Sequence, residues 1–362
     1  AFASTASLSI LLHSVIVDPY VWIFGRFITG FSIISIFVVV ESWLNDRATN
    51  TTRGKILSIY MILTFAGIGA GVLLLNFNNP EEFEPFILVT LLFSLALIPI
   101  LLTKRKPPSF KKISRIKIKE LYKISPFGTF SMLCTGFIHP VIFTMGAVYG
   151  AMMNFSVLEI SLYLFLITIM GAIFQWPIGY LSDKFDRRLV IIICGLLGAI
   201  FCIFCFLSVS VSPDFTNLSS NWKSTLNHIA NHRMFFYIFI SLYAGMSLPL
   251  FSLNLAYVND FLPKEKFVSA GGGLQIIFGI SAMFAPFICS FFMNKFGPNG
   301  LFIFLFTFQM LIFIFGVYRM TKRAVEENPN NTFTPLPRNI TPVGIELDPE
   351  TGVDLSNSPN KK

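Results

Sequence analysis

Charged side chains are scarce in this sequence. Asp, Glu, Lys and Arg together make up 13% of the 362 residues, whereas a soluble domain contains about 25%. Hydrophobic residues make up 54% of the chain, and 42 residues are Phe. These proportions exclude an ordinary soluble domain and indicate a protein with many membrane-spanning segments.

Cysteine and histidine are also few, and their spacing does not suggest a catalytic or metal site. The five cysteines all lie within apolar runs. Cys202 and Cys205 have the separation of redox and metal motifs, but no second cysteine pair or nearby histidine accompanies them. We interpret them as small apolar helix residues. Since no Ser/His/Asp or Cys/His arrangement is present either, we expect no enzymatic activity, no cofactor and no metal.

Ten apolar runs follow one another along the chain. A helix of about 20 apolar residues crosses the hydrocarbon core of a bilayer. The runs are residues 2–17, 21–44, 56–76, 86–102, 127–152, 158–180, 189–209, 235–258, 268–293 and 301–318. The sequence therefore predicts an all-α polytopic membrane protein with ten transmembrane helices.

Positive charge is concentrated in alternate connections between these runs. One set of loops, together with the C-terminal tail, carries most of the Lys and Arg residues, whereas the opposite set carries only Lys223, Arg233 and Lys295. Basic loops stay in the cytoplasm, so we predict a cytoplasmic C-terminus. A nucleic-acid surface would gather the charge on one folded face. The net charge of +8 is therefore interpreted as a topology signal, and we expect no nucleic-acid partner.

An internal repeat divides the chain into two parallel, pseudo-symmetric halves. The segment Trp43-Leu-Asn-Asp46 ends one run and Tyr257-Val-Asn-Asp260 ends another, and each is followed by a basic loop and a Gly-rich run. The predicted parts are an N-terminal bundle at 1–102, a basic cytoplasmic linker at 103–125, a C-terminal bundle at 126–320 and a tail at 321–362. The composition of the tail predicts disorder.

A short charged turn, residues 175–188, joins two of the apolar runs. It reads Gln-Trp-Pro-Ile-Gly-Tyr-Leu-Ser-Asp-Lys-Phe-Asp-Arg-Arg. Gly179 leaves the helix surface open where a neighbouring helix can approach. Asp183 can accept hydrogen bonds from the free N–H groups at the start of another helix.

These residues, with Lys184, Arg187 and Arg188, resemble the loop signature Gly-x-Leu-x-Asp-Arg-x-Gly-Arg-Arg of the major facilitator superfamily (MFS). The family carries this signature between helices 2 and 3, and often again between helices 8 and 9. Lys184 stands where Arg is usual, and Asp186 stands where the second Gly is usual. The resemblance implies a cytoplasmic gate.

In that gate, Asp183 would meet the helix that begins near Gly54 and Lys55. The pair formed by Arg187 and Arg188 would bind acids of the other half. The acids that we expect there are Glu41 or Asp46.

The register of the repeat aligns the ten runs with helices 3–12 of the twelve that the family has, so we expect helices 1 and 2 to be missing from this sequence. The segments 41–45, 53–61 and 175–179 are similar to a bacterial branch of mostly uncharacterised, drug-exporter-like members. This similarity implies an inner-membrane secondary transporter in which two helical bundles rock about a central site. The exporter signature, a Gly-Pro pair in a Gly-rich helix, is not matched at 67–71, which leaves the direction of transport open.

Two charged residues are candidates for coupling. Arg26 is the one basic residue inside an apolar run, where a charge is costly. With Gly30 it resembles a helix 4 pattern that is associated with coupling in proton-coupled exporters. The alternative is an arginine that reaches the external interface, which Tyr20 and Trp22 would mark. Glu41 is a candidate either for coupling or for an ion pair at a gate.

Several uncharged polar residues are candidates for the lining of a substrate cavity. One helix carries a polar stripe at helical spacing, which suits a wet cavity better than lipid. Others lie singly on flanking helices, where bonds that only pack helices together are the alternative. The candidates are Tyr243, Ser247 and Asn254 on the stripe, and His139, Gln175 and Gln275 elsewhere.

Together these features predict a transporter of a small organic solute by alternating access. Its expected partners are that solute, protons as a coupling ion and the lipid bilayer, and proton-coupled efflux by an antiporter is one form of it. Metabolite uptake by the same fold, or a transporter-derived membrane sensor that acts through its tail, are the alternatives. The expected location is the bacterial inner (plasma) membrane.

Overall fold

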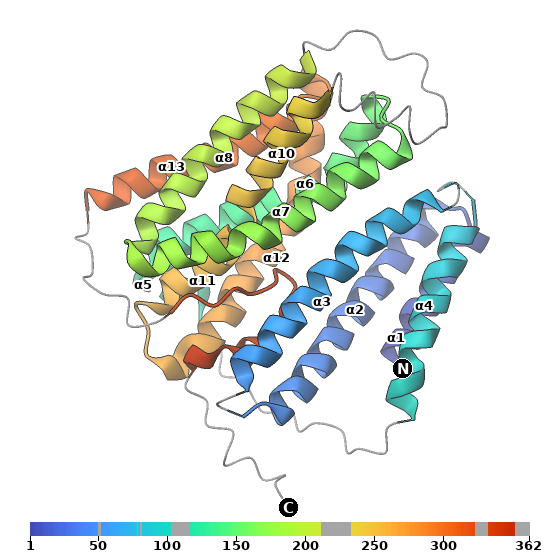
Figure 1. Cartoon of the computed structure of the whole chain (residues 1–362), viewed down its shortest axis with the longest axis horizontal. Helices are drawn as coiled ribbons and strands as arrows, with labels where there is room; N and C mark the ends of the chain where they lie inside the picture. The colour runs from blue at the N-terminus through green and yellow to red at the C-terminus, as the bar shows by residue number, and fades with distance from the viewer. Residues whose placement is uncertain are drawn as a thin grey trace, which may run out of the picture. The chain divides into compact units, whose positions relative to one another are not determined.

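The computed structural model describes residues 1–49, 52–77, 79, 82–102, 116–210, 233–322 and 332–351. Within these ranges all regular secondary structure is helical (Figure 1), so the predicted all-α class is confirmed. Eight of the described helical segments are long and apolar enough to cross a membrane. The other two predicted spans form shorter apolar helices, Phe2–Val15 and Glu84–Ile98.

Contacts between residues divide the chain into two compact units. The first unit comprises Ala1–Ile59, Leu74–Ile113 and Asn339–Lys362, and the second comprises Tyr60–Leu73 and Ser114–Arg338. This division differs from the predicted boundary between two halves. Part of a helix of the N-terminal half groups with the second unit, and the C-terminal tail is shared between the units.

The first unit is built on three apolar helices, and α1 packs against both α2 and α4. Asp18 starts α2, since its Oδ1 accepts hydrogen bonds from the backbone N–H groups of Tyr20 at 2.9 Å and Val21 at 3.0 Å. Such a side chain replaces helix bonds that the first turn lacks. The elements are α1 (Phe2–Val15), α2 (Pro19–Arg47), the start of α3 (Arg53–Leu73), η1 (Leu74–Asn76), α4 (Glu84–Leu101), η4 (Gly344–Leu347) and η5 (Pro349–Thr351).

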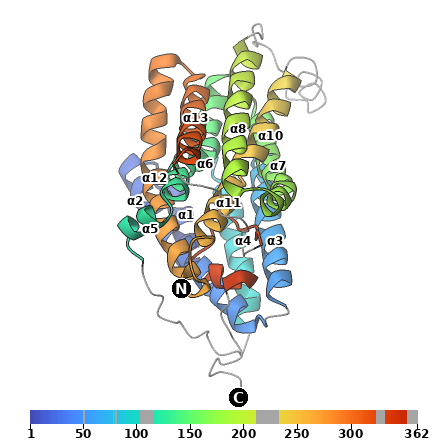
Figure 2. The same cartoon turned by 90° about the vertical axis from the view of Figure 1, so that its left-hand side faces the viewer.

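The second unit is a bundle in which α6 contacts α7, α11, α12 and α13, while α8 contacts α10 and α13. Figure 2 shows α7, α8 and α10 side by side. The elements that follow α3 are α5 (Ile118–Ile124), α6 (Pro126–Met152), α7 (Val157–Lys184), α8 (Arg187–Ser210), α10 (Met234–Ser247), α11 (Leu250–Asn259), η3 (Lys264–Lys266), α12 (Phe267–Phe296) and α13 (Gly300–Met320).

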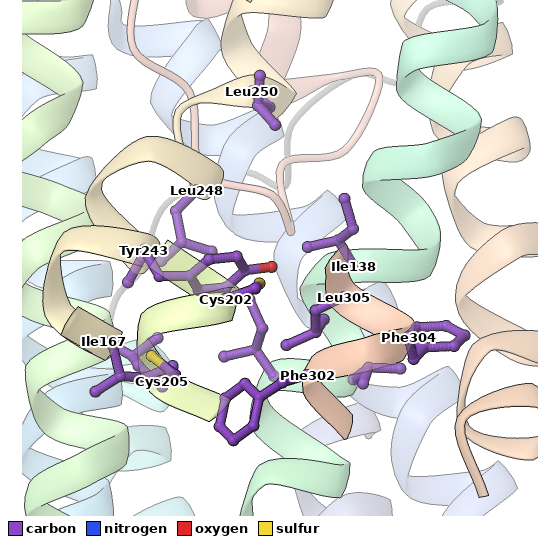
Figure 3. Close-up of a cluster of buried hydrophobic side chains, with 14 of the residues drawn as sticks. Ile138, Ile167, Cys202, Cys205, Tyr243, Leu248, Leu250, Phe302, Phe304 and Leu305 are labelled. Atoms are coloured by element: carbon purple, nitrogen blue, oxygen red, sulfur yellow. The ribbon is translucent and has the colours of Figure 1, made fainter. Parts of the chain in front are cut away.

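An apolar core lies between these helices (Figure 3). Ile138, Tyr243 and Phe302 come from three different helices and are almost completely buried. Cys202 and Cys205 lie in the same core and are free thiols, as expected for apolar helix residues. Because lipid is as apolar as these side chains, close packing rather than removal from water holds such a core together.

One predicted span is interrupted near its middle. The sequence suggests a continuous helix at 235–258, but α10 ends at Ser247 and α11 begins at Leu250. Pro249 lies between them, directly before α11. Proline has no N–H for the helix and its ring clashes with the preceding turn. Because Pro140, Pro177 and Pro286 lie within uninterrupted helices, the proline contributes to the break but does not by itself account for it.

Parts of the predicted linker and of the predicted tail have defined positions. Residues 103–115 of the predicted linker lie outside the described ranges, but α5 follows them and buries Leu121 completely. In the tail, residues 332–351 have defined positions and bury Leu336, Ile340 and Ile345. Residues 323–331 and 352–362 lie outside the described ranges. Disorder is therefore the wrong prediction for residues 332–351, because these apolar side chains pack on helices.

Candidate functional site

Buried polar side chains meet around the break between α10 and α11. On one side of the break, Asn254 of α11 donates from Nδ2 to Oγ1 of Thr135 on α6 at 3.0 Å. On the other side, Ser247 of α10 accepts at Oγ from Nε2 of Gln309 on α13 at 3.1 Å. All four residues are fully buried. Polar groups within a membrane bundle need such partners because lipid offers none.

His139 of α6 joins the same cluster. Its Nε2 lies 2.9 Å from the backbone oxygen of Ser247. Because a carbonyl only accepts, Nε2 carries the hydrogen in this contact. The last carbonyls of α10 lack the partners that a continuous helix would supply, so His139 supplies one of them. This is the bond that the helix-packing interpretation predicts for His139.

The remaining candidates for the cavity lie at different depths. Tyr243 lies in the apolar core near Cys202 (Figure 3). Gln175 of α7 is buried, and Gln275 of α12 is half-buried. In this structure protein atoms enclose Tyr243, Ser247 and Asn254, and none of their surface is accessible. Exposure of these three residues to water in another state stays a prediction.

The signature around Asp183 forms an ion-pair network within the second unit. Arg187 is 1% exposed, and its Nη2 lies 2.9 Å from Oδ1 of Asp183. Its Nη1 donates to Oδ1 of Asp260 at the end of α11. Asp260 is the repeat counterpart of Asp46. Arg187 is thus paired with acids of its own unit, and the expected pairing of Arg187 and Arg188 with Glu41 or Asp46 stays a prediction.

Asp186, one of the two departures from the family signature, begins α8. Its Oδ1 accepts from the backbone N–H of Arg188 at 2.9 Å, and its Oδ2 lies 3.2 Å from Nη2 of the same residue. An aspartate directly before a helix is a preferred cap, a signal that the sequence analysis missed. Lys184, the other departure, is exposed and places Nζ 4.4 Å from the ring centroid of Tyr180.

Asp183 also binds the C-terminal tail. Its Oδ1 accepts the backbone N–H of Phe333 at 2.7 Å. Gly179, one helical turn earlier, faces the Phe333 ring, and a Cβ built on it would lie 2.2 Å from Cδ1 of that ring. Both Gly179 and Asp183 contact the tail in this structure, whereas the prediction for them was contact with a neighbouring helix. A contact of Asp183 with Gly54 and Lys55 stays a prediction.

Glu41 of α2, in the first unit, is fully buried and also binds the tail. Its Oε2 accepts the backbone N–H of Thr341 at 2.9 Å and the hydroxyl of the same residue. One turn on, Asn45 donates to the backbone oxygen of Val343. Arg26, on the same helix, is exposed. The coupling roles of Arg26 and Glu41 stay predictions.

A buried ion pair at the other end of α7 was not foreseen. Arg233 places Nη1 2.6 Å from Oε1 of Glu159, and their side chains are 4% and 0% exposed. The second oxygen of Glu159 accepts from the backbone and hydroxyl of Ser156 at 2.8 and 3.0 Å. The spacing from Ser156 to Glu159 is that of a capping box and could have revealed Glu159. We find no sequence signal that pairs it with Arg233.

No cluster of three or more His, Cys, Asp or Glu side chains suited to a metal ion occurs within the described ranges.

Comparisons with known proteins identify relatives over most of the chain. The family model described as Major Facilitator Superfamily matches residues 1–222 and 172–350. The uncharacterized MFS-type transporter YcaD of Escherichia fergusonii is 25% identical over 293 residues, which cover 78% of this chain and 68% of that protein. An uncharacterized MFS-type transporter of Yersinia enterocolitica is 23% identical over 292 residues, or 79% of this chain and 69% of that one.

Among solved structures, the fucose:proton symporter FucP of E. coli is similar with a TM-score of 0.47 and 12% identity. The match covers 88% of this chain and 81% of that one.

Proposed function

The chain belongs to the major facilitator superfamily, and from this membership we propose that it is a multi-pass membrane transporter that moves a small organic solute by alternating access. The transporters of Escherichia and Yersinia to which it is similar support transport as the general activity. The cytoplasmic C-terminus and the inner-membrane location rest on the distribution of basic residues.

The observation that carries this proposal is the interrupted span. Transporters bind their substrates near the middle of the bilayer, at helices that break there. Here Ser247 and Asn254 flank a break at the middle of the span 234–259. A purely structural helix would not need a break surrounded by polar side chains from α6 and α13.

The contacts at the break suggest how a solute would bind. The hydroxyl of Ser247 and the amide of Asn254 now bond to Gln309 and Thr135. Such partners satisfy the polar groups while no solute is bound. A solute with hydroxyl, carbonyl or amide groups could replace them bond for bond, which would limit the free-energy cost of opening the cluster.

Proton-coupled efflux is the specific form that we propose. Arg26 carries the coupling role because a permanent charge within an apolar helix is costly to keep. Uptake driven by the same gradient is the alternative direction. If coupling needs Arg26, then Arg26→Ala and Arg26→Lys both lose gradient-driven flux, because Lys lacks the planar fork of the guanidinium. Gradient-driven flux at the level of the unsubstituted protein in Arg26→Ala would leave Arg26 as an interfacial residue.

The experiment is a flux screen in proteoliposomes with and without a pH gradient. A mixture of metabolites is offered, and the solutes that cross are identified by mass spectrometry. We expect one solute class to move, and we expect Ser247→Ala and Asn254→Ala to lower its flux at least tenfold. The matched control is Ser281→Ala, because Ser281 is buried on α12 and donates only to its own helix, at Ile277. No transported solute, or equal losses in all three variants, would contradict the proposal.

A sensor is the second candidate, and the packed tail favours it. Within the second unit Phe333 bonds to Asp183, and within the first unit Thr341 bonds to Glu41. Deletion of residues 324–362 separates the two functions. A transporter keeps its flux without the tail, whereas a sensor loses its output.

A further inference from the structure

The first stretch of the described tail, residues 332–338, lies along three helices of the second unit. It contacts α7 through Phe333, α11 through Leu336 and α6 through Arg338. The three contacts recur at short intervals along a segment without regular secondary structure, and each uses a different chemistry.

The first contact is a notch for an aromatic ring. Gly179 has no side chain, and the Phe333 ring fills the space where a Cβ would lie. Asp183, one turn further along α7, accepts the N–H of the same residue at 2.7 Å. Ring and backbone are therefore recognised together by two residues four positions apart.

The second contact binds both polar groups of the Leu336 backbone. The hydroxyl of Ser252 donates to the backbone oxygen of Leu336 at 2.9 Å and accepts from its N–H at 3.0 Å. A hydroxyl has one donor and two acceptor positions, so it can make both bonds at once. Both residues are buried, Ser252 at 1% and Leu336 at 2% exposed. Since the Leu336 side chain is enclosed as well, the position suits an apolar residue with a free backbone N–H and C=O.

The third contact holds a cation. The guanidinium carbon of Arg338 lies 3.8 Å from the ring centroid of Phe143, and Nη1 lies 3.5 Å from the backbone oxygen of His139. Aromatic faces and carbonyl oxygens both attract a cation. Burial lowers the pKa of Arg338 to about 10, so the guanidinium keeps its charge at neutral pH.

We propose that the second unit carries a binding site for an extended, guanidinium-bearing peptide, and that residues 332–338 are its tethered occupant. The site selects an aromatic residue, then free backbone groups three positions on, then a guanidinium two positions further. A peptide of this kind that came from elsewhere would have to displace the tail before it could bind Ser252 and Phe143.

Residues 332–338 can occupy the site with only a few contacts because they are covalently joined to the bundle. A segment joined by a short chain is present at an effective concentration of about millimolar. The residues that follow are held in turn, since Thr341 bonds to Glu41 in the first unit. The same peptide, free in solution, should therefore bind only weakly. A Kd on the order of 10–100 μM is enough for the joined segment to be bound most of the time.

The test uses the full chain with a weakened tail, Phe333→Ala together with Arg338→Ala. The probe is a fluorescent peptide of residues 332–338, capped at both ends, and its binding is followed by anisotropy. We expect binding to the weakened chain at least tenfold tighter than to the unsubstituted chain, whose own tail competes. A probe peptide with Arg338→Ala should bind at least tenfold more weakly than the original probe. Equal binding to both chains, or no binding to either, would overturn the proposal.

A second measurement, cysteine labelling, needs no added peptide. It also distinguishes release of the tail from general unfolding of the bundle. Ser252→Cys places a thiol under Leu336, and the five native cysteines are buried, which keeps background labelling low. Weakening the tail should increase the rate of maleimide labelling at position 252 at least tenfold. In a control chain that carries Ser281→Cys, the rate should be the same with both tails. Equal acceleration at positions 252 and 281 would show general loosening and would contradict a docked ligand. Neither readout depends on flux, so both remain informative if the transport proposal fails.

Discussion

Each end of α7 carries a carboxylate paired with an arginine, but the two carboxylates differ in their exposure to solvent. At the first turn, Glu159 pairs with Arg233, and both side chains are nearly inaccessible. At the last turn, Asp183 pairs with Arg187, and the aspartate side chain is 33% exposed. Glu159 is surrounded by partners from the bundle itself, namely Ser156 and Arg233. Asp183 completes its contacts with a residue of the tail, Phe333.

The difference in exposure indicates that the contact of Glu159 with Arg233 is permanent, whereas the contact of Asp183 with Phe333 can be exchanged. A buried ion pair that loses one partner leaves a charge without compensation, at a cost of about 3–5 kcal/mol. A half-exposed carboxylate can turn to water when its partner leaves, so its loss costs much less. The first turn of α7 is therefore suited to hold the bundle together, and the last turn is suited to bind and release a segment.

The largest expected effect is at the permanent end. Arg233→Ala should lower the free energy of unfolding by about 3–5 kcal/mol, because Glu159 would remain buried and unpaired by Arg233. Denaturant unfolding in detergent measures this loss. Lys295→Ala is the control, because Lys295 is exposed and its removal should change stability by less than about 0.5 kcal/mol. Similar free energies of unfolding for the two variants would show that the buried pair does not stabilise the bundle.

Removal of the Arg187 guanidinium at the last turn of α7 should lower the free energy of unfolding by a smaller amount. Arg187 bridges Asp183 and Asp260, so Arg187→Ala should cost about 1.5–3 kcal/mol by the loss of charged hydrogen bonds. Arg187→Lys should recover part of this, since it keeps the charge but cannot bridge two acids with a planar fork. The same unfolding experiment compares the three chains. A loss as large as that of Arg233→Ala would remove the distinction between the two ends.

Gly179→Ala should release the tail while leaving the bundle stable. The added Cβ would collide with the Phe333 ring, and a loss of about 1.4 kcal/mol in docking raises the open population tenfold. Trypsin cleavage after Arg338 measures this population and should be about tenfold faster. Gly67→Ala is the matched control, because a Cβ there meets no atom within 4 Å. Equal cleavage in the two variants would contradict docking of the ring on Gly179.

The smallest effect is expected for Asp183→Asn. The amide oxygen can still accept the N–H of Phe333, while the ion pair with Arg187 becomes a hydrogen bond from a charged guanidinium to a neutral amide. We expect a stability loss of about 0.5–1 kcal/mol and a modest gain in trypsin cleavage after Arg338. If the predicted gate exists, this variant also makes cytoplasmic cavity positions more reactive and slows turnover. Cysteine labelling and flux that both match the unsubstituted protein would leave the gate without support.

Much of the fold follows from the sequence because membrane helices depend on local composition. Apolar length alone located the segments that became α2, α3 and α6, since each must satisfy its own backbone in lipid. The missing N–H of proline does not by itself identify the break at Pro249, because Pro140, Pro177 and Pro286 lie within continuous helices. The order of the tail could not be predicted either, because its contacts with Ser252 and Glu41 join segments far apart in the chain.

The candidate site was predictable in its chemistry but not in its partners. Helical spacing put Ser247 and Asn254 on one stripe, and the signature put Gly179 and Asp183 on one helix surface. Which group fills each position depends on tertiary contacts between distant segments. Phe333 lies 150 positions from Asp183 along the chain, and no local pattern records such a pairing.

The contrast between the two ends of α7 is tested most directly by hydrogen exchange. Backbone exchange would be compared between the full chain and the full chain with Phe333→Ala and Arg338→Ala. Our account predicts faster exchange in the last turn of α7 and the start of α11, with no change in the first turns of α7 and α10. Equal acceleration at both ends, or no change at either, would contradict the claim that the tail holds one end and the bundle's own ion pair holds the other.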